Sequence, residues 1–238
     1  MHEDIFDFDG NYGERYEVLA RRVIPGYRTL FPMFTALIEP ELPRGGRVLV
    51  VGAGTGIEIV HLKRARPDLR VHGVDPSEHM LELAERRVAE AGVGDGVTLQ
   101  LGYAADVPID PPFDAATLIN VLHFVPDDGG KAALLADIAR RLRPGGIFVF
   151  YDLHGGDTPE EHERYLAAWR RYWQIRGMSP EEMREFNDRI REGIHFSAAS
   201  RSIELALAAG FEEPERFYKS LLYGGWTFRR TASTPPAP

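Results

Sequence analysis

Val48-Leu49-Val50-Val51-Gly52-Ala53-Gly54-Thr55-Gly56-Ile57-Glu58 is an apolar run that leads into a turn with three alternating glycines. A strand that is apolar on both faces suits the buried centre of a parallel sheet. The glycines allow the backbone of the turn to approach a ligand where a Cβ would collide. A second apolar run, 71–74, ends at Asp75. A carboxylate at this separation can accept hydrogen bonds from both hydroxyls of a ribose, so the sequence predicts a nucleoside-cofactor site.

The spacing of the glycines separates two kinds of nucleoside cofactor. Dinucleotide-binding folds carry the pattern Gly-x-Gly-x-x-Gly, in which the last glycine allows close helix packing. Here the third glycine is Gly56, and Ile57 stands where that fingerprint has its glycine. The pattern Gly52-x-Gly54-x-Gly56 therefore disfavours NAD.

These residues resemble motif I of the class I methyltransferases that depend on S-adenosyl-L-methionine (SAM), with Asp75 as the acidic residue after the second strand. The resemblance continues in order along residues 45–152. Residues 102–108 are similar to the adenine-contacting segment after the third strand, 113–120 to the fourth strand, and 142–150 to the turn and fifth strand. A doubly wound domain that binds another ligand at its glycine-rich turn is the alternative interpretation.

The resemblance implies an enzyme that uses SAM as methyl donor and releases S-adenosylhomocysteine. It implies an α/β, Rossmann-like class I methyltransferase fold, in which a seven-stranded, mostly parallel sheet has an antiparallel last strand. We expect one methyltransferase domain over 1–230, followed by a flexible tail at 231–238. Its expected parts are an N-terminal helical segment (1–44), a SAM-binding core (45–154), a helical cap (155–195), and a C-terminal helix and hairpin (196–230).

Alternating helix and strand signals support this fold. Predicted strands at 47–51, 70–74, 97–101, 114–119 and 146–151 are separated by predicted helices at 55–65, 77–91 and 129–142. Such alternation predicts a parallel sheet with the ligand at the carboxyl ends of its strands. Helices at 14–22 and 27–39 precede this pattern, and a helix at 200–209 with strands at 214–220 and 222–229 follows it.

Two helix-start signals interrupt the alternation after the fifth predicted strand. Thr158 and Ser179 are each followed by proline at the first helical position and by glutamate at the third. Two helices should therefore begin there and form an inserted cap.

Composition limits the function further. The chain has 238 residues, no cysteine and a formal charge of −8. Without cysteine there is no disulfide, no cysteine-ligated metal and no thiolate nucleophile, and we expect no metal site. The acidic charge opposes general attraction to nucleic acid and leaves tRNA as the one plausible nucleic-acid partner. Apolar runs are too short to span a membrane, so we expect a cytoplasmic enzyme that acts on a small molecule, with a homodimer possible.

The cofactor residues follow from the chemistry of SAM and from the resemblance. Asp75 should bind the ribose hydroxyls, and Ala53, Gly54 and Thr55 should approach the methionine end. Pro76 and Met80 are placed to flank the adenine, although a helix start and core packing explain them equally well. Many relatives carry an aspartate where this chain has Tyr103. We therefore expect the adenine contact to rest on the main chain at Ala104. The predicted set is Gly52, Ala53, Gly54, Thr55, Gly56, Asp75, Pro76, Met80, Tyr103, Ala104 and Asn120.

The segment after the fourth predicted strand reads Asn120-Val121-Leu122-His123-Phe124. It lacks the Asn/Asp-Pro-Pro-Tyr motif of methyltransferases that act on amino groups of bases or on glutamine amides. Asn120 should face the sulfonium or other polar groups of the cofactor. His123 is either a general base near neutral pH or a histidine hydrogen-bonded inside the loop. Tyr16 is a second catalytic candidate, because relatives often fold this segment over the cofactor.

The predicted cap carries an aromatic stripe that bears on the acceptor. Tyr165, Trp169, Tyr172 and Trp173 share one helix face. This stripe is either the core of the cap or a dimer contact, or it is a wall for an apolar or planar substrate. The predicted substrate residues are Tyr12, Arg28, His154, Trp169 and Trp173.

Two short segments show a second resemblance. Residues 24–27 and 208–211 look like the carboxy-SAM synthase family of tRNA wobble-uridine modification. That family uses an arginine in the helix before the second segment to hold the extra carboxylate of its cofactor. Here Leu205 aligns with it, and Arg201 lies one turn earlier. A SAM methyltransferase acting on a small molecule is therefore favoured, with a carboxy-SAM or tRNA-modifying enzyme and a noncatalytic SAM-binding protein as alternatives.

Overall fold

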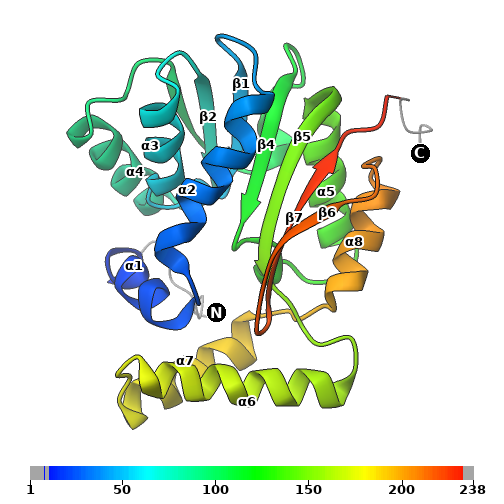
Figure 1. The fold of residues 1–238 in the computed structure, drawn as a ribbon. Helices are drawn as coiled ribbons and strands as arrows, with labels where there is room; N and C mark the ends of the chain where they lie inside the picture. Colours follow the sequence, from blue (N-terminus) through cyan, green and yellow to red (C-terminus); the bar gives the residue numbers. More distant parts are fainter. Residues whose placement is uncertain (1–7, 9–10, 233–238) are drawn as a thin grey trace.

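A seven-stranded sheet forms the centre of the computed structural model, which describes Phe8 and residues 11–232, with only the backbone of residues 11–14 (Figure 1). Its order is β3-β2-β1-β4-β5-β7-β6. Neighbouring strands from β3 to β5 are parallel, and β7 runs antiparallel to both β5 and β6. The predicted fold class is thereby confirmed. The strands are β1 (Arg47–Val51), β2 (Arg70–Asp75), β3 (Val97–Leu101), β4 (Phe113–Ile119), β5 (Leu142–Leu153), β6 (Glu215–Ser220) and β7 (Tyr223–Arg229).

Helices cover both faces of the sheet because its central strands are apolar on both sides. Val48 and Val50 of β1 face α2 (Tyr27–Ile38), α3 (Ile57–Ala65) and α4 (Glu78–Glu90). Leu49 and Val51 face α5 (Gly130–Arg141) and α8 (Ala199–Ala208). The two apolar cores lie on opposite sides of the same strands.

Three further helices lie at the carboxyl ends of the strands. They are α1 (Asn11–Val23), α6 (Pro159–Ile175) and α7 (Pro180–Gly193). Figure 1 shows α6 and α7 across the bottom of the molecule, with α1 beside them. Short 3-10 turns complete the chain as η1 (Glu39–Glu41), η2 (Ala104–Asp106) and η3 (Leu122–Phe124).

Both cap helices begin where their capping signals predict. Thr158 Oγ1 accepts a hydrogen bond from the Glu161 amide at 3.1 Å, and Ser179 Oγ accepts one from the Glu182 amide at 3.2 Å. The Glu182 carboxylate in turn accepts from the Ser179 amide at 2.6 Å. These bonds satisfy amides that lack a partner inside the helix.

Several predicted boundaries differ from the observed ones, and for two of them the structure gives the physical reason. The helix after the glycine turn starts at Ile57, because Gly56 has a left-handed φ of 74° and stands outside the helix as its N-cap. Strand β5 starts at Leu142, because Leu142 pairs with Phe113 before an irregularity in the register. Of the predicted tail, residues 233–238 lie outside the described part of the chain. Within the described residues, no helix combines the length and apolarity needed to cross a membrane.

Candidate functional site

The glycine turn after β1 combines close packing with open space. Gly52, Gly54 and Gly56 have φ values of 73°, 50° and 74°. A Cβ on Gly56 would lie 2.9 Å from Ala84 Cα, and a Cβ on Gly52 would lie 2.3 Å from Val121 Cγ2. On Gly54 the nearest atom would be 3.9 Å away. The outer glycines therefore allow neighbouring segments to pack, and the middle glycine borders free space.

Asp75 stands beside this turn at the end of β2. Its Oδ2 accepts a hydrogen bond from the Gly54 amide at 2.8 Å, and its Oδ1 accepts one from the Ser77 amide at 3.0 Å. Only 8% of Asp75 is exposed. The next residues start α4, where Pro76 is exposed and Met80 is buried. The carboxylate thus joins the glycine turn to the start of α4.

The loop after β3 presents an aromatic ring to the surface. Tyr103 is 67% exposed, whereas Ala104 is buried. The Tyr103 amide donates to Asp106 Oδ2 at 2.8 Å, so Asp106 braces the loop. Tyr103 is therefore held at its backbone and projects its ring outward.

A buried acid lies on the first turn of α3, directly after the glycine turn. Glu58 is 6% exposed, and its Oε1 has no hydrogen-bond partner among the described residues. Burial raises the pKa of Glu58 to about 7, and the Thr117 side chain opposes this shift. Desolvation favours the neutral carboxylic acid here.

Helix α1 contacts the glycine turn through Glu17, a residue that sequence reasoning missed. Thr55 Oγ1 donates to Glu17 Oε1 at 2.8 Å. Glu17 also forms ion pairs with Arg87 of α4 and, at 3.3 Å, with Arg21. No local pattern signals the contacts with Thr55 and Arg87, because both residues lie far from Glu17 in the sequence.

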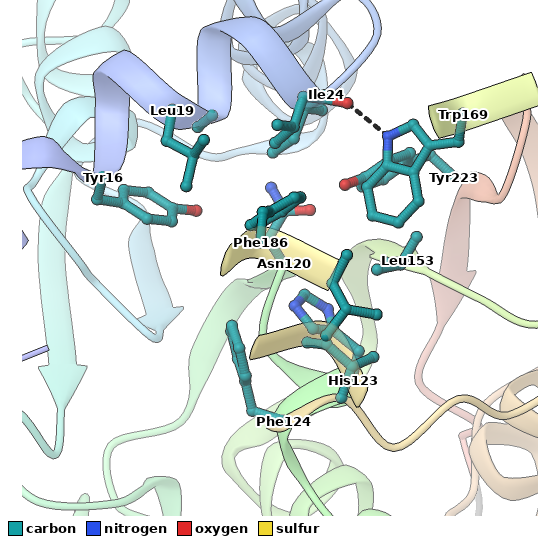
Figure 2. Close-up of a pocket in the computed structure, with 14 residues that line it drawn as sticks. Tyr16, Leu19, Ile24, Asn120, His123, Phe124, Leu153, Trp169, Phe186 and Tyr223 are labelled. Atoms are coloured by element: carbon teal, nitrogen blue, oxygen red, sulfur yellow. Dashed lines mark hydrogen bonds between the residues drawn. The ribbon is translucent and has the colours of Figure 1, made fainter. Parts of the chain in front are cut away.

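A cavity of about 40 Å³ lies between α1, the ends of β4 and β5, the cap and β7 (Figure 2). Its wall is mainly apolar, and none of the described residues that line it is Asp, Glu, Lys or Arg. Aromatic rings form much of the wall, from Tyr16, Phe124, Trp169, Phe186 and Tyr223. The structure thus brings together Tyr16, Asn120, His123 and Trp169, four of the predicted residues.

Asn120 directly follows β4 and lines this cavity. It has a left-handed φ of 57°, and its amide donates to the Tyr151 carbonyl at 2.8 Å. The side chain is buried, and its Oδ1 has no hydrogen-bond partner among the described residues. A left-handed non-glycine residue costs about 1–2 kcal/mol, and an unpaired buried acceptor about 1–3 kcal/mol. The unpaired buried oxygen makes Asn120 a candidate functional residue.

His123 lies on the cavity wall and is hydrogen-bonded to a carboxylate. Its Nδ1 contacts Asp152 Oδ1 at the end of β5, and both residues are buried. The Leu153 amide donates to the same oxygen at 2.9 Å. A carboxylate selects the tautomer in which Nδ1 carries the proton, so Nε2 keeps its lone pair. The two interpretations of His123 are therefore compatible.

His154 does not line the cavity, and its role as a substrate residue stays a prediction. Leu153 faces the cavity, so the next residue points to the opposite side of the sheet. The His154 ring packs edge-on against Trp226 at 5.0 Å, and its Nε2 has no hydrogen-bond partner in the described part. Burial lowers the pKa of His154 to about 4.

The aromatic stripe of the cap divides between core and wall. Trp169 lines the cavity and donates from Nε1 to the Val23 carbonyl at 2.6 Å. Trp173 is fully buried, lies off the cavity wall, and packs against Trp169 and Phe186. Trp173 thus belongs to the apolar core between α6 and α7, and its role as a substrate residue stays a prediction.

Two further predicted substrate residues are not placed at the cavity. Arg28 is exposed on α2 and does not line it. The side chain of Tyr12 lies outside the described part of the chain.

Comparison with known sequences gives consistent matches. Residues 48–146 match the family model described as "Methyltransferase domain". A demethylmenaquinone methyltransferase from Symbiobacterium thermophilum is 40% identical over 188 residues, covering 76% of this chain and 73% of that protein. A carboxy-S-adenosyl-L-methionine synthase from Marinobacter nauticus is 30% identical over 216 residues, covering 90% of this chain and 86% of that protein.

Solved structures share the fold. A protein described as a putative O-methyltransferase from Nostoc punctiforme has a TM-score of 0.67 at 16% identity, covering 92% of this chain and 59% of that chain. A protein described as a putative sarcosine dimethylglycine methyltransferase from Galdieria sulphuraria has a TM-score of 0.62 at 17% identity, covering 86% of this chain and 85% of that chain.

Proposed function

The chain belongs to the class I SAM-dependent methyltransferase family, and on that premise we propose that it methylates a small, neutral and largely apolar acceptor bound in the cavity beside α1. The enzyme uses SAM and produces S-adenosylhomocysteine. One observation supports this acceptor class above others. The cavity wall is apolar and aromatic, and the hydrogen-bonded pair His123–Asp152 meets it at one point.

The residues at the carboxyl ends of β1, β2 and β4 fit SAM. Asp75 has the charge to bind the ribose hydroxyls, and the free space beside Gly54 suits the methionine end. The unpaired Oδ1 of Asn120 offers a partial negative charge toward the sulfonium. SAM supplies an electrophilic methyl group on a positively charged sulfur. Tyr103 and the main chain at Ala104 are the proposed adenine contacts.

His123 is the proposed base for the acceptor proton. An imidazole accepts protons efficiently near neutral pH. Asp152 is hydrogen-bonded to Nδ1, which carries the ring proton, so the lone pair of Nε2 can accept the proton of the acceptor. Tyr16, on the opposite wall, is proposed to orient the acceptor (Figure 2). Alignment of acceptor and methyl group supplies the rest of the catalysis.

Entry of an acceptor requires movement of α1 or the cap. The cavity measures about 40 Å³, whereas small-molecule sites typically enclose about 300–1,000 Å³. Helix α1 supplies Tyr16, Leu19, Ala20 and Val23 to its wall, and the cap supplies Trp169 and Phe186 among others. Movement of the cap alone would enlarge the cavity and keep the contact between Glu17 of α1 and the glycine turn.

A carboxy-SAM synthase activity is the second candidate, supported by the relative that matches 90% of the chain. The described residues offer no cation for an extra carboxylate at the cavity. Arg201 is exposed and paired with Asp127 at 3.3 Å and Glu204 at 2.9 Å, while Leu205 is buried. Mass spectrometry of the cofactor that copurifies with the protein separates the two candidates. A carboxylated SAM would overturn our proposal. The cytoplasmic location and a homodimer stay predictions.

The decisive experiment measures S-adenosylhomocysteine release over a panel of phenols, hydroquinones, amines and small acids. We expect turnover with a neutral hydroxylated ring, and a loss of about 10²–10⁴-fold in His123→Asn at unchanged SAM affinity. The control is His72→Asn, because His72 is also hydrogen-bonded, to Gln100 at 2.9 Å, but does not line the cavity. Full turnover in His123→Asn would remove His123 from the mechanism.

A further inference from the structure

A buried lysine lies next to the His123–Asp152 pair. Lys131, on the first turn of α5, is 2% exposed. Its Nζ donates to the His195 carbonyl at 2.6 Å and to Ser197 Oγ at 2.8 Å. Lysine is almost never fully buried unless its ammonium group is paired, because removing that charge from water is costly. Its position therefore calls for a reason beyond packing.

The segment that Lys131 holds contacts the backbone of His123 and the backbone just after Asp152. The His195 amide donates to the His123 carbonyl at 2.8 Å. The Gly155 amide, three residues after Asp152, donates to the Ser197 carbonyl at 2.9 Å. Lys131 thus fixes residues 195–197, which follow the cap. These residues hydrogen-bond to the segments that carry His123 and Asp152.

Lys131 also acts on the pair through its charge. The Asp152 and Asp127 carboxylates stabilise the ammonium, and burial opposes them, so that the pKa of Lys131 is lowered overall. His154 is influenced by Lys131 and Asp152, and it also has His123 and Asp157 among its charged neighbours. Burial lowers the pKa of His154 to about 4, so at pH 7 that ring adds no positive charge beside Asp152.

We propose that Lys131 is a positioning residue for the His123–Asp152 pair. This inference rests on the proposed role of His123 as the base. The ammonium lies within electrostatic reach of the Asp152 carboxylate, which is also hydrogen-bonded to the imidazole. Without the ammonium, an imidazolium would be needed to balance Asp152, and protonation of the ring would become easier.

The test compares Lys131→Gln and Lys131→Met, which remove the charge, with Lys131→Arg, which keeps it. Lys63→Gln is the matched control, since Lys63 is 3% exposed and donates to the Pro67 carbonyl at 2.6 Å and the Leu69 carbonyl at 2.7 Å. Nuclear magnetic resonance follows the His123 ring signals against pH and needs no acceptor. The pH profile of kcat is recorded with the acceptor found in the panel.

We expect both charge-removing variants to move the titration midpoint of the His123 ring, and the acidic limb of the kcat profile, to higher pH by about one unit. Lys131→Arg should restore the wild-type midpoint, and Lys63→Gln should leave it unchanged. If one charge-removing variant does not fold, the other provides the comparison. A wild-type midpoint in the folded variant would overturn the role of Lys131. Failure of the base proposal is seen separately, as full turnover of His123→Asn.

Discussion

The two ends of the proposed reaction site are built in different ways. The donor end consists of the glycine turn and Asp75, and its geometry comes from backbone conformation within residues 48–77. The acceptor end is assembled from side chains of α1, η3, β5, α6, α7 and β7. A site made by local backbone geometry leaves a pattern in the sequence. A site made by packing of distant side chains leaves none that a general motif detects.

The sharpest test of the donor end is Gly56→Ala. A Cβ would meet the Ala84 backbone at 2.9 Å, and the φ of 74° disfavours any side chain. We expect a loss of about 3 kcal/mol, from about 1–2 kcal/mol of conformational strain and the remainder from overpacking. Urea unfolding measures it. The control is Gly92→Ala, where φ is 66° and no atom lies within 4 Å, with an expected loss of about 1 kcal/mol. Equal losses would show that close packing of α3 on α4 is unimportant.

The two ends should respond to pH in opposite directions. Near the acceptor end, burial lowers the pKa of His154 to about 4, below the ordinary value of 6.5. As pH falls from 6.5 to 4, the unfolded chain takes up this proton before the folded chain does. The free energy of unfolding therefore decreases by about 3 kcal/mol over this range. His154→Leu should remove that decrease, and a curve parallel to wild type would contradict the assignment.

At the donor end, burial raises the pKa of Glu58 to about 7 from its ordinary 4.5. As pH rises from 4.5 to 7, the unfolded chain loses this proton before the folded chain does. The free energy of unfolding therefore decreases by about 3 kcal/mol over this range. Glu58→Gln should abolish this decrease. Urea unfolding of both single variants from pH 4 to 8 compares the two ends directly. If His154 and Glu58 changed the free energy of unfolding in the same direction with pH, the predicted contrast between the two ends would be wrong.

SAM affinity should depend on the donor end alone. Asp75→Ala removes a carboxylate proposed to bind the ribose, and charge-assisted hydrogen bonds contribute about 1.5–3 kcal/mol. We expect affinity to fall about ten-fold to a hundred-fold by isothermal titration calorimetry. Asp68→Ala is the control, because Asp68 also accepts from a loop amide, that of Gly45 at 2.7 Å. Unchanged affinity in Asp75→Ala would remove Asp75 from the cofactor site.

The smallest effect concerns the join between α1 and the cap. Trp169→Phe keeps an aromatic ring on the cavity wall and removes the hydrogen bond to the Val23 carbonyl. Loss of this buried bond should cost about 1 kcal/mol in urea unfolding. SAM affinity should stay at the wild-type value. A large loss of SAM affinity would show that the two ends are not independent.

The fold was predictable because its signals are local. The apolar run of β1 and the capping residues Thr158 and Ser179 each act within one turn or strand. The start of β5 was not predictable, because Leu142 is drawn into the sheet by pairing with Phe113, far away in the sequence.

Within the site, sequence reasoning reached individual residues but not their partners. His123 and Asp152 lie 29 positions apart, and Glu17 lies 38 positions from Thr55. The orientation of His154 depends on which residue of β5 faces the cavity, and alternation alone leaves both choices open. Tertiary packing decides these contacts, and it is absent from any short window of the sequence.

The fluorescence of Trp169, whose indole is hydrogen-bonded to α1, can report on the contact between α1 and the cap. The indole lies between the two segments whose separation would admit an acceptor, and its N–H is bonded to the Val23 carbonyl. Indole emission shifts to longer wavelength when the ring meets water. The other two tryptophans, Trp173 and Trp226, are buried in the cap and in the opposite core. Stopped-flow fluorescence can therefore time the opening of the unlabelled enzyme during turnover.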